Sequence, residues 1–320
     1  MAVKSMGNLD LRGLFVGLST VDFAYLVEAL PGRNEKASAR SQQISAGGPA
    51  ANAAVAFSFL GGNSVLVTAV GHHPLGDVIR NDLNHCAVSL RDIASEHKEA
   101  PPVSSIFITR KSGERTVVSA NANAFPTLEW RVDPKWFDGA STLLVDGHYM
   151  PLCVAAAKQA RSRAIPVLLD GGSWKAGMHD LIANVDMAIC SSDFRPPGCR
   201  NESDLFEFLS AKGITSAAIT RGAEAIRYTH NGVNGELPIQ RVRVVDTLGA
   251  GDILHGAFCY WACQPEHGFL DSLEFAARIA TFSCLYFGTR AWMEVFPGTQ
   301  AIMRELPDMH ERTGGPAVAS

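Results

Sequence analysis

Short apolar runs recur along the chain, separated by stretches long enough for helices. Several runs, such as 142–146 (TLLVD) and 165–170 (IPVLLD), are apolar at consecutive positions, as strands buried on both faces are. This pattern predicts strands at 14–18, 64–70, 142–146, 165–170, 185–190 and 216–221. It predicts helices at 49–60, 75–86, 151–163, 203–212, 252–264 and 271–287. The alternation indicates an α/β fold in which helices cover both faces of a mainly parallel sheet.

Two stretches, 21–46 and 103–121, break this alternation, and each reads as strand, turn, strand. In the second, SSIFIT and RTVVSA flank a loop at 111–114 that contains Gly113, which suits a hairpin. We predict that the two stretches form a small β-sheet outside the main one. Such a sheet serves as a lid over an active site or as a dimer face.

Composition narrows the classes of protein. The chain has 320 residues, and its 28 Lys and Arg against 32 Asp and Glu give a net charge of −4. Because no block of basic residues stands out, we expect neither nucleic acid nor a membrane surface as partner. No apolar run approaches the ~18 residues that span a bilayer, and no signal peptide is recognisable. We expect a cytoplasmic protein with a flexible tail at 311–320.

The strongest chemical signal is the string VVDTLGAGD at 244–252, which leads into an apolar helix. Gly249 and Gly251 let backbone amides converge where that helix begins, and the helix dipole adds positive potential, so this is a candidate anion site. A phosphate bound there lies within reach of Asp252, which suits phosphoryl transfer with a carboxylate as base. The helix N-terminus favours the charged carboxylate and predicts a weak base. The alternative is that Asp252 merely caps the helix.

A second signal is the segment AGGPAANAAVAFSFLGG at 46–62. Pro49 suits the first helical position and Gly61 the C-terminal end, while small residues allow a ligand to approach. Asn52 is the polar side chain of its first turns, and it can bind a hydroxyl or a neighbouring loop. Asp22 follows the first strand, at the edge where α/β sheets bind ligands, although an Asp also stabilises turns.

The sequence does not support several other enzyme classes, because their sequence signatures are missing. The sequence has no GxxxxGK[ST], HExxH or GxSxG string, and Gly249-Ala250-Gly251 lacks the third glycine of a dinucleotide fingerprint. The seven cysteines are scattered without a CxxC pair, so we predict reduced thiols rather than disulfides or a zinc site.

The two glycine-bearing segments together resemble the ribokinase-like (PfkB) family of carbohydrate kinases. The resemblance implies a three-layer α/β/α fold with a small β-sheet lid. It also implies ATP and Mg²⁺ as cofactors, with K⁺ around Asp246 as a further candidate. It makes Asp252 the catalytic base and places an anion hole at Gly249, Ala250 and Gly251. It assigns the acceptor sugar to Asp22, Gly48 and Asn52, and the nucleotide to Thr220, Gly222 and Ser191.

The family usually carries Asn-x-x-Glu near mid-chain, whereas this sequence has Ser191 and Phe194 at the corresponding positions. Animal ketohexokinases show the same departure, which leaves the magnesium surroundings open and no metal ligand assigned. By resemblance the α/β domain comprises 1–20, 47–102 and 122–310. The lid comprises 21–46 and 103–121.

Motif detail looks closest to ketohexokinase and to bacterial ketose and sulfofructose kinases, so a neutral ketose such as fructose is the first expectation. A sulfonate or phosphate on the acceptor would need a cation, for which Lys36 in the lid and His148 after a strand are candidates. A nucleoside kinase using Phe23, Tyr25 and Phe125 stays open, as does a non-catalytic sugar-binding protein. We also expect a homodimer formed through the lid.

Overall fold

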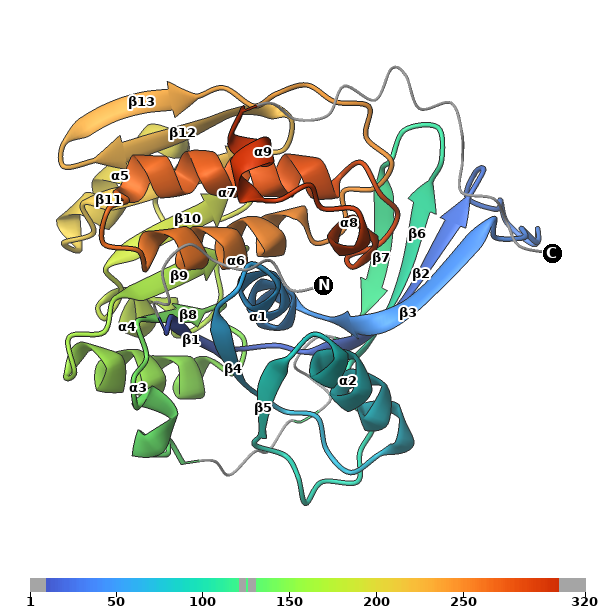
Figure 1. The fold of residues 1–320 in the computed structure, drawn as a ribbon, viewed down its shortest axis with the longest axis horizontal. Coiled ribbons are helices and arrows are strands. Elements are labelled where there is room, and N and C mark those ends of the chain that lie inside the picture. The colour runs from blue at the N-terminus through green and yellow to red at the C-terminus, as the bar shows by residue number, and fades with distance from the viewer. Residues whose placement is uncertain (1–9, 121–124, 126–130, 305–320) are drawn as a thin grey trace.

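The computed structural model describes residues 10–120, 125 and 131–304. In this part of the chain the larger sheet has the strand order β13-β12-β11-β10-β9-β8-β1-β4-β5 (Figure 1). From β11 to β5 all neighbouring strands pair in parallel, whereas β12 and β13 are antiparallel additions at one edge. The strands are β1 (Arg12–Val16), β4 (Asn63–Thr68), β5 (Val88–Asp92), β8 (Thr142–Val145), β9 (Val167–Gly171), β10 (Met187–Ser191), β11 (Ser216–Arg221), β12 (Glu224–His230) and β13 (Val233–Leu237).

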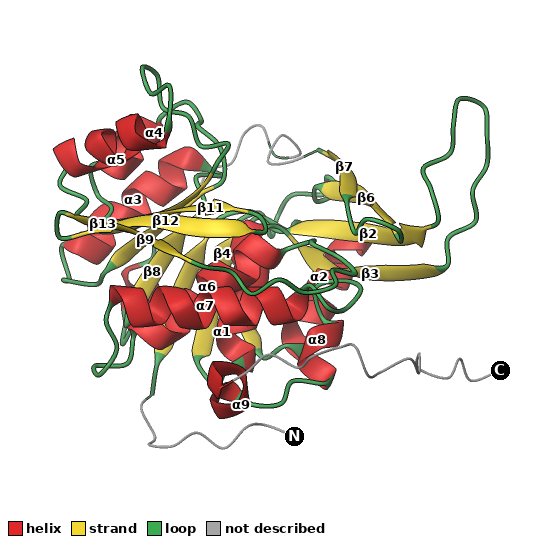
Figure 2. Ribbon diagram, turned by 90° about the horizontal axis from the view of Figure 1, so that it is seen from above, coloured by secondary structure: helices red, strands yellow, loops and turns green. Residues whose placement is uncertain are grey.

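Helices lie on both faces of this sheet, which confirms the predicted α/β class and its three layers (Figure 2). One face is covered by α3 (Met150–Arg161), α4 (Met178–Ile182) and α5 (Glu202–Ala211). The other is covered by α1 (Pro49–Phe59), α2 (Pro74–His85), α6 (Ala250–Ala262), α7 (Phe269–Ser283), α8 (Ala291–Glu294) and α9 (Thr299–Arg304). Each layer buries its own apolar core against the sheet, as the consecutive apolar runs require.

A second sheet of four strands stands beside the main one, in the order β3-β2-β6-β7 (Figure 1). Its strands are β2 (Thr20–Val27), β3 (Ser41–Gly47), β6 (Val103–Thr109) and β7 (Arg115–Ser119). The two hairpins meet through the parallel pair β2–β6. Ala24, Ile106 and Ile108 form a small buried cluster on one face, against which Leu248 and Phe287 of the main body pack. The use of this sheet as a lid stays a prediction.

The structure confirms some of the predicted bounds of helices and strands and differs from others. Helix α1 begins at Pro49 and ends before Gly61, whose φ is 114°. The helix predicted at 271–287 ends at Ser283, because the chain then turns back towards the 244–248 loop, whose Val245 amide donates to the Cys284 carbonyl. Strands β5, β12 and β13 were not predicted, and the tail at 311–320 lies outside the described residues.

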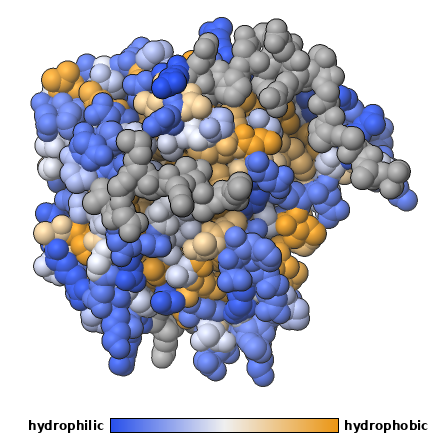
Figure 3. Space-filling view, in the orientation of Figure 1, coloured by the Kyte–Doolittle hydropathy of each residue, from blue (hydrophilic) through white to orange (hydrophobic). Residues whose placement is uncertain are grey.

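Three further observations concern the surface, the length of the helices and the cysteines. In the space-filling view, hydrophobic surface gathers where the main body meets the small sheet, while most of the remaining face is hydrophilic (Figure 3). Across the described ranges, no helix is long and apolar enough to cross a bilayer. All seven cysteines are free, and three of them, Cys153, Cys190 and Cys259, are buried.

Candidate active site

The site centres on the beginning of α6. Gly249 is the N-cap residue with a φ of 69°, and a Cβ there would come within 2.7 Å of the Thr289 side chain, so the position needs glycine. The helix begins at Ala250, which makes Asp252 its third residue. Asp252 therefore does not cap the helix, and that alternative from the sequence is wrong. The carboxylate is left available for another role.

Backbone amides at this helix start are available to an anion. The Ala250 amide makes only a long contact of 3.3 Å to the Thr247 carbonyl. In the part of the chain that the structure describes, the amides of Gly251 and Asp252 have no backbone acceptor. Unpaired amides at the positive end of a thirteen-residue helix favour a bound phosphate.

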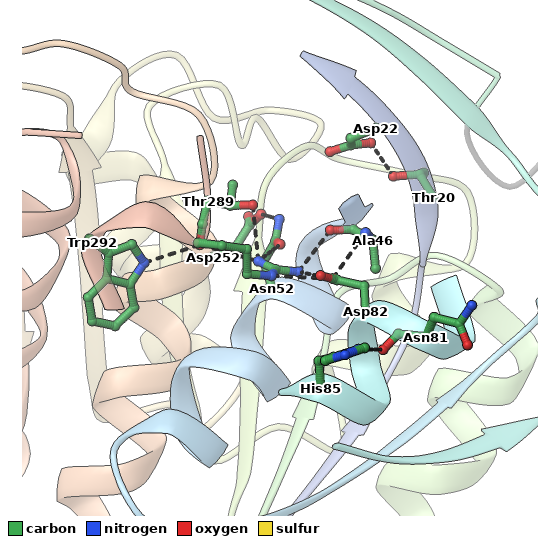
Figure 4. A network of polar contacts seen from close by, with 11 residues as sticks. Thr20, Asp22, Ala46, Asn52, Asn81, Asp82, His85, Asp252, Thr289 and Trp292 are labelled. Atoms are coloured by element: carbon green, nitrogen blue, oxygen red, sulfur yellow. Dashed lines mark hydrogen bonds and ion pairs between the residues drawn. The ribbon is translucent and has the colours of Figure 1, made fainter. Parts of the chain in front are cut away.

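Helix α1 approaches α6 closely enough to pair their polar side chains. At Gly256, one turn beyond Asp252, a Cβ would lie 2.2 Å from the Ala53 carbonyl oxygen, so only glycine permits this distance between the helices. Asn52, next to Ala53, is buried, and its Nδ2 donates to the Asp252 carboxylate at 2.8 Å (Figure 4). The two strongest motifs, 200 residues apart, thus meet at one hydrogen bond.

The surrounding protein raises the pKa of Asp252 to about 6. Desolvation is the main cause, and the negative charge of Asp170 adds to it. The hydrogen bond from Asn52 acts in the opposite direction. The prediction that the helix N-terminus would make Asp252 a weak base is therefore wrong, because burial and a like charge outweigh the helix dipole. A carboxyl with this pKa is largely ionised at neutral pH and is a better proton acceptor than an ordinary Asp.

Asp170 and His255 form a buried pair behind the base, and sequence reasoning missed both. Asp170 is the penultimate residue of β9, and its carboxylate lies 3.6 Å from Nδ1 of His255 on α6. The His255 ring also contacts two carbonyl oxygens, Gly251 at 2.7 Å and Ile189 at 3.1 Å. These contacts tie the first turn of α6 to strand β10. The polar Asp at the end of an apolar strand was the available signal.

Asp22 lies in β2, on the face of the small sheet that turns towards the site. It is buried, and burial raises its pKa, while hydrogen bonds from Thr20 and Ser104 lower it. A Cβ on Gly47 would lie 1.8 Å from the Asp22 carboxylate, and Gly48 has a φ of 93° with the Leu18 carbonyl beside it. The glycine pair therefore lets Asp22 approach the start of α1. Figure 4 shows Asp22 apart from the Asn52–Asp252 contact, with its drawn hydrogen bond coming from the Thr20 hydroxyl.

Asp146 organises the strand ends next to this region. Its carboxylate accepts backbone N–H groups from Leu18, Ala50 and His148, at 2.8, 3.3 and 2.8 Å. It thereby holds the loops after β1 and β8 against the first turn of α1. Burial lowers the pKa of His148, so its ring is neutral near pH 7. His148 lies at the edge of the site, beside Lys175, which donates to the Asp146 carbonyl at 3.3 Å.

The structure does not bring Lys36 to the site. Lys36 is exposed in the connection between β2 and β3. Five residues of extended strand separate Asp22 from the end of β2 at Val27, which is roughly 17 Å. The prediction that Lys36 could anchor an anionic acceptor is therefore not supported, since the connection begins at the far end of the strand.

The three residues predicted to bind the nucleotide cluster at adjacent strand ends. Ser191 ends β10 and is paired in register with Thr220 of the parallel neighbour β11. Gly222 makes the turn into β12 with a φ of 64°. Ser191 Oγ donates to the Gly172 carbonyl at 2.8 Å, and Phe194 is buried in the core. Their use for nucleotide binding stays a prediction.

Comparison with known proteins gives the family of the chain. A family model described as "pfkB family carbohydrate kinase" matches residues 12–295. The chain belongs to this family. Among curated relatives of this kinase, a ribokinase of Arabidopsis thaliana is 26% identical, covering 83% of this chain and 74% of its own length. A ribokinase of Lactococcus lactis is 24% identical with 91% and 96% coverage, and a deoxyribokinase of Salmonella typhi is 23% identical with 86% and 93%.

Solved structures share the fold of the kinase. The Arabidopsis thaliana ribokinase, solved with ribose and ATP, has a TM-score of 0.73 at 22% identity and covers 92% of this chain and 98% of its own. The adenosine kinase of Sinorhizobium meliloti has a TM-score of 0.74 at 16% identity, with 92% and 99% coverage. The ribokinase-like fold is thus confirmed, while the closeness to ketohexokinase stays a prediction.

Arg115 is a further residue of the kinase that sequence reasoning missed. It opens β7, and its guanidinium donates to the carbonyl oxygen of Thr247 at 2.7 Å and to its hydroxyl at 3.1 Å. The small sheet is thereby attached to the loop that precedes the anion site. Burial raises the pKa of Asp246, and the charge of Arg115 partly offsets the rise there as it does at Asp252. An Arg beside a hairpin glycine was a weak signal, because its partner is 132 residues away.

Among the residues that the structure describes, no group of three or more His, Cys, Asp or Glu side chains could hold a metal ion. This fits Mg²⁺ that enters with the phosphates of a nucleotide, because Mg²⁺ commonly keeps waters and uses few protein ligands. Asp246 accepts from the amides of Leu248 and Gly288, each at 2.8 Å. A K⁺ site beside it stays a prediction.

Proposed function

We propose that the kinase transfers the γ-phosphoryl group of ATP to a hydroxyl of a small sugar. The observation that carries this is the meeting of Asp252, with a pKa of about 6, and the unpaired amides at the start of α6. A base beside an anion site is what phosphoryl transfer from a hydroxyl acceptor needs. The ribose and ATP bound to the Arabidopsis relative support this choice of substrates.

In the proposed reaction the acceptor hydroxyl donates its proton to Asp252. The oxygen of the acceptor hydroxyl forms a bond to the γ-phosphorus. The bond from this phosphorus to the bridging oxygen of ATP breaks, and ADP leaves. The amides of Gly249, Ala250 and Gly251 stabilise the charge on the transferring group. Mg²⁺ bound to the phosphates supplies further charge neutralisation.

The sugar is held, in this proposal, between the small sheet and the start of α1. Asp22 accepts hydrogen bonds from sugar hydroxyls, and the Gly48 backbone lies beside it. Asn52 has a second Nδ2 hydrogen to donate, since one N–H faces Asp252. Arg115 keeps the small sheet against the Thr247 loop, which limits the access of water as a competing acceptor.

ATP lies across the ends of β10 and β11 in this proposal. Ser191 and Thr220 are side by side there, and at Gly222 the place that a Cβ would take is open space. The His255 contact to the Ile189 carbonyl brings α6 to β10, two residues before Ser191. The γ-phosphate then reaches the anion site while the nucleoside stays on the strand edge.

We infer a neutral acceptor, with a ketose such as fructose first. His148 is neutral because burial lowers its pKa, and Lys36 is remote, so neither of the two predicted cationic anchors for an anionic acceptor is available. The names of the ribokinase and deoxyribokinase relatives favour a pentose as the second candidate. A sulfo- or phospho-sugar would depend on Lys175, whose amine contacts the carbonyls of Asp146 and Ser173.

A nucleoside acceptor finds less support. Phe125 is buried against Ala69 and Ala94, where it cannot stack on a base. Tyr25 stacks on Phe107 within the small sheet, with ring centroids 5.7 Å apart. Phe23, the third aromatic candidate, is half-buried and packs against the main core. A non-catalytic role is disfavoured by the retained and electrostatically tuned Asp252.

The test is ADP release from ATP and Mg²⁺ in the presence of fructose, ribose, deoxyribose, fructose 6-phosphate and adenosine. We expect kcat/KM to be highest for a neutral sugar. Asp252→Asn, prepared in parallel, controls for contaminating kinases. Turnover with adenosine alone, or with the phosphorylated sugar alone, contradicts the proposed acceptor. Absence of turnover with every acceptor contradicts the proposed reaction.

A further inference from the structure

A buried arginine lies one residue away from the proposed base in the hydrogen-bond network. Arg290 immediately precedes α8 and exposes only 9% of its surface. Its guanidinium joins segments that are far apart in the sequence, on α1, α2 and β3. The acceptors are Asn52 Oδ1 at 3.0 Å, the Ala46 carbonyl at 2.8 Å, Asp82 Oδ2 at 2.9 Å and Thr289 Oγ1 at 3.0 Å.

The contact to Asn52 determines which way its amide points. A guanidinium only donates hydrogen bonds, so the oxygen of the amide must face Arg290. The Nδ2 group then faces the opposite side and donates to Asp252 at 2.8 Å. An amide turned by 180° would set N–H groups against the guanidinium and an oxygen against the carboxylate. Both contacts are satisfied in one orientation only.

We propose that Arg290 is a positioning residue that locks the Asn52 amide so that its N–H group faces Asp252. This inference rests on the proposed function, because it gives Arg290 a role in preparing the base. Arg290 is itself held by the ion pair to Asp82 and by the backbone of Ala46, next to the Gly47–Gly48 pair. The same side chain thus links the acceptor-binding segment to the base.

The role of Arg290 can be measured through the pKa of Asp252. The hydrogen bond from Asn52 is the largest influence that lowers the pKa of Asp252. Loss of the lock would let the amide turn, remove this donor and raise the pKa of Asp252. The charged and titratable neighbours are Asp170, His255, Arg115 and Asp22 around Asp252, and Asp82, Cys86 and Asp22 around Arg290.

The experiment follows the Asp252 carboxyl by ¹³C NMR titration of the full, substrate-free chain, with its signal assigned by Asp252→Asn. We expect Arg290→Gln to raise the titration midpoint by about one pH unit. The acid limb of kcat shifts in the same direction. Arg80→Gln is the matched control, because Arg80 makes a similar ion pair to Asp92 at 2.8 Å and a bond to the Gly71 carbonyl. It should leave the midpoint in place.

A double-mutant cycle separates positioning from a direct effect of charge. In an Asn52→Leu background, Arg290→Gln should add no further shift, since Arg290 acts through Asn52. A shift as large as in the wild-type background, or no shift from Arg290→Gln at all, overturns the inference. If Arg290→Gln does not fold, Arg290→Lys replaces it. The ammonium has three donors and lacks the planar five-donor fork that reaches Asn52, Asp82 and the Ala46 carbonyl together. A smaller rise of the midpoint is therefore expected, and no rise contradicts the inference. The titration needs no substrate, so its outcome is independent of whether Asp252→Asn abolishes turnover.

Discussion

At the scale of residues, the site is governed by burial. Asp252 sits at a helix N-terminus, which stabilises a negative charge by about 0.3–1 kcal/mol at exposed positions. Desolvation and the nearby Asp170 work against this and dominate, so that the pKa is raised to about 6. The carboxylate is therefore kept in a destabilised charged form at neutral pH. That state favours proton abstraction and costs folding stability.

The stability of Asp252→Asn follows from this linkage. Because the native pKa of Asp252 exceeds its unfolded value, the native state binds more protons between about pH 4 and pH 6. The contribution of this group to the free energy of unfolding is thus lost as pH rises through that window, and it stays lost above it. We expect Asp252→Asn to be more stable than the wild type at pH 8, by about 1–3 kcal/mol, in urea denaturation.

The difference should shrink at pH 4.5, where the wild-type carboxyl is protonated. Asp204→Asn is the control, because backbone and Arg200 contacts lower the pKa of that exposed carboxyl, and the linkage has the opposite sign. An Asp252→Asn protein that is no more stable than the wild type at pH 8 would contradict the raised pKa.

At the scale of elements, the pairing of α1 with α6 positions the site. Their contact depends on Gly256, since a Cβ there would meet a backbone carbonyl of α1 that has little freedom to move. The glycine lies one turn from Asp252, and its neighbour across the interface is next to Asn52. The distance between two helices thus sets the hydrogen bond at the base.

Gly256→Ala should separate the helices and weaken the Asn52–Asp252 contact. We expect a loss of about 1–3 kcal/mol in the free energy of unfolding, typical of overpacking, together with a fall in kcat. Thermal unfolding and steady-state kinetics on the same preparation measure both. Gly268→Ala adds one methyl group where the nearest atom is 3.6 Å away and should change neither by much. Wild-type values in Gly256→Ala would show that the helix contact is not limiting.

At the scale of the whole molecule, the face of the small sheet opposite the cluster of Ala24, Ile106 and Ile108 exposes apolar side chains. Val118 on β7 is 68% exposed, and Ile44 on β3 is 46% exposed. Both belong to one row of cross-strand neighbours, which runs from Val118 through Ser105 and Phe23 to Ile44. Directly opposed residues lie on the same face of a sheet. We infer that this face packs against a second copy of the chain.

Light scattering coupled to size exclusion tests the dimer. We expect a dimer at micromolar concentration and a shift towards monomer in Val118→Asp, because an unpaired charge would be buried in the contact. Val233→Asp is the control, since Val233 is 65% exposed on β13 of the main sheet. A monomeric wild type, or equal effects of the two variants, contradicts the inference.

Most of the main sheet could be predicted, because strands such as β8 and β9 are buried on both faces and read as continuous apolar runs. Strands β5 and β13 lie at the edges, where alternating polar residues hide the pattern. In the site, the start of the helix and Asp252 could be predicted, because the neighbouring residues in the sequence identify them. The pKa of Asp252 could not, since it depends on Asp170, which is 82 residues away. The role of Arg290 could not either, since it depends on Asn52, which is 238 residues away.

The central claim is that Asp252 accepts the proton of the acceptor hydroxyl. The most direct measurement compares kcat of wild type and Asp252→Asn on the best acceptor at pH 7.5, with ATP binding measured by calorimetry on the same samples. We predict that kcat falls by ~10² or more, the scale of general-base catalysis, while the Kd for ATP stays within about threefold. Turnover of Asp252→Asn close to that of the wild type would contradict the account.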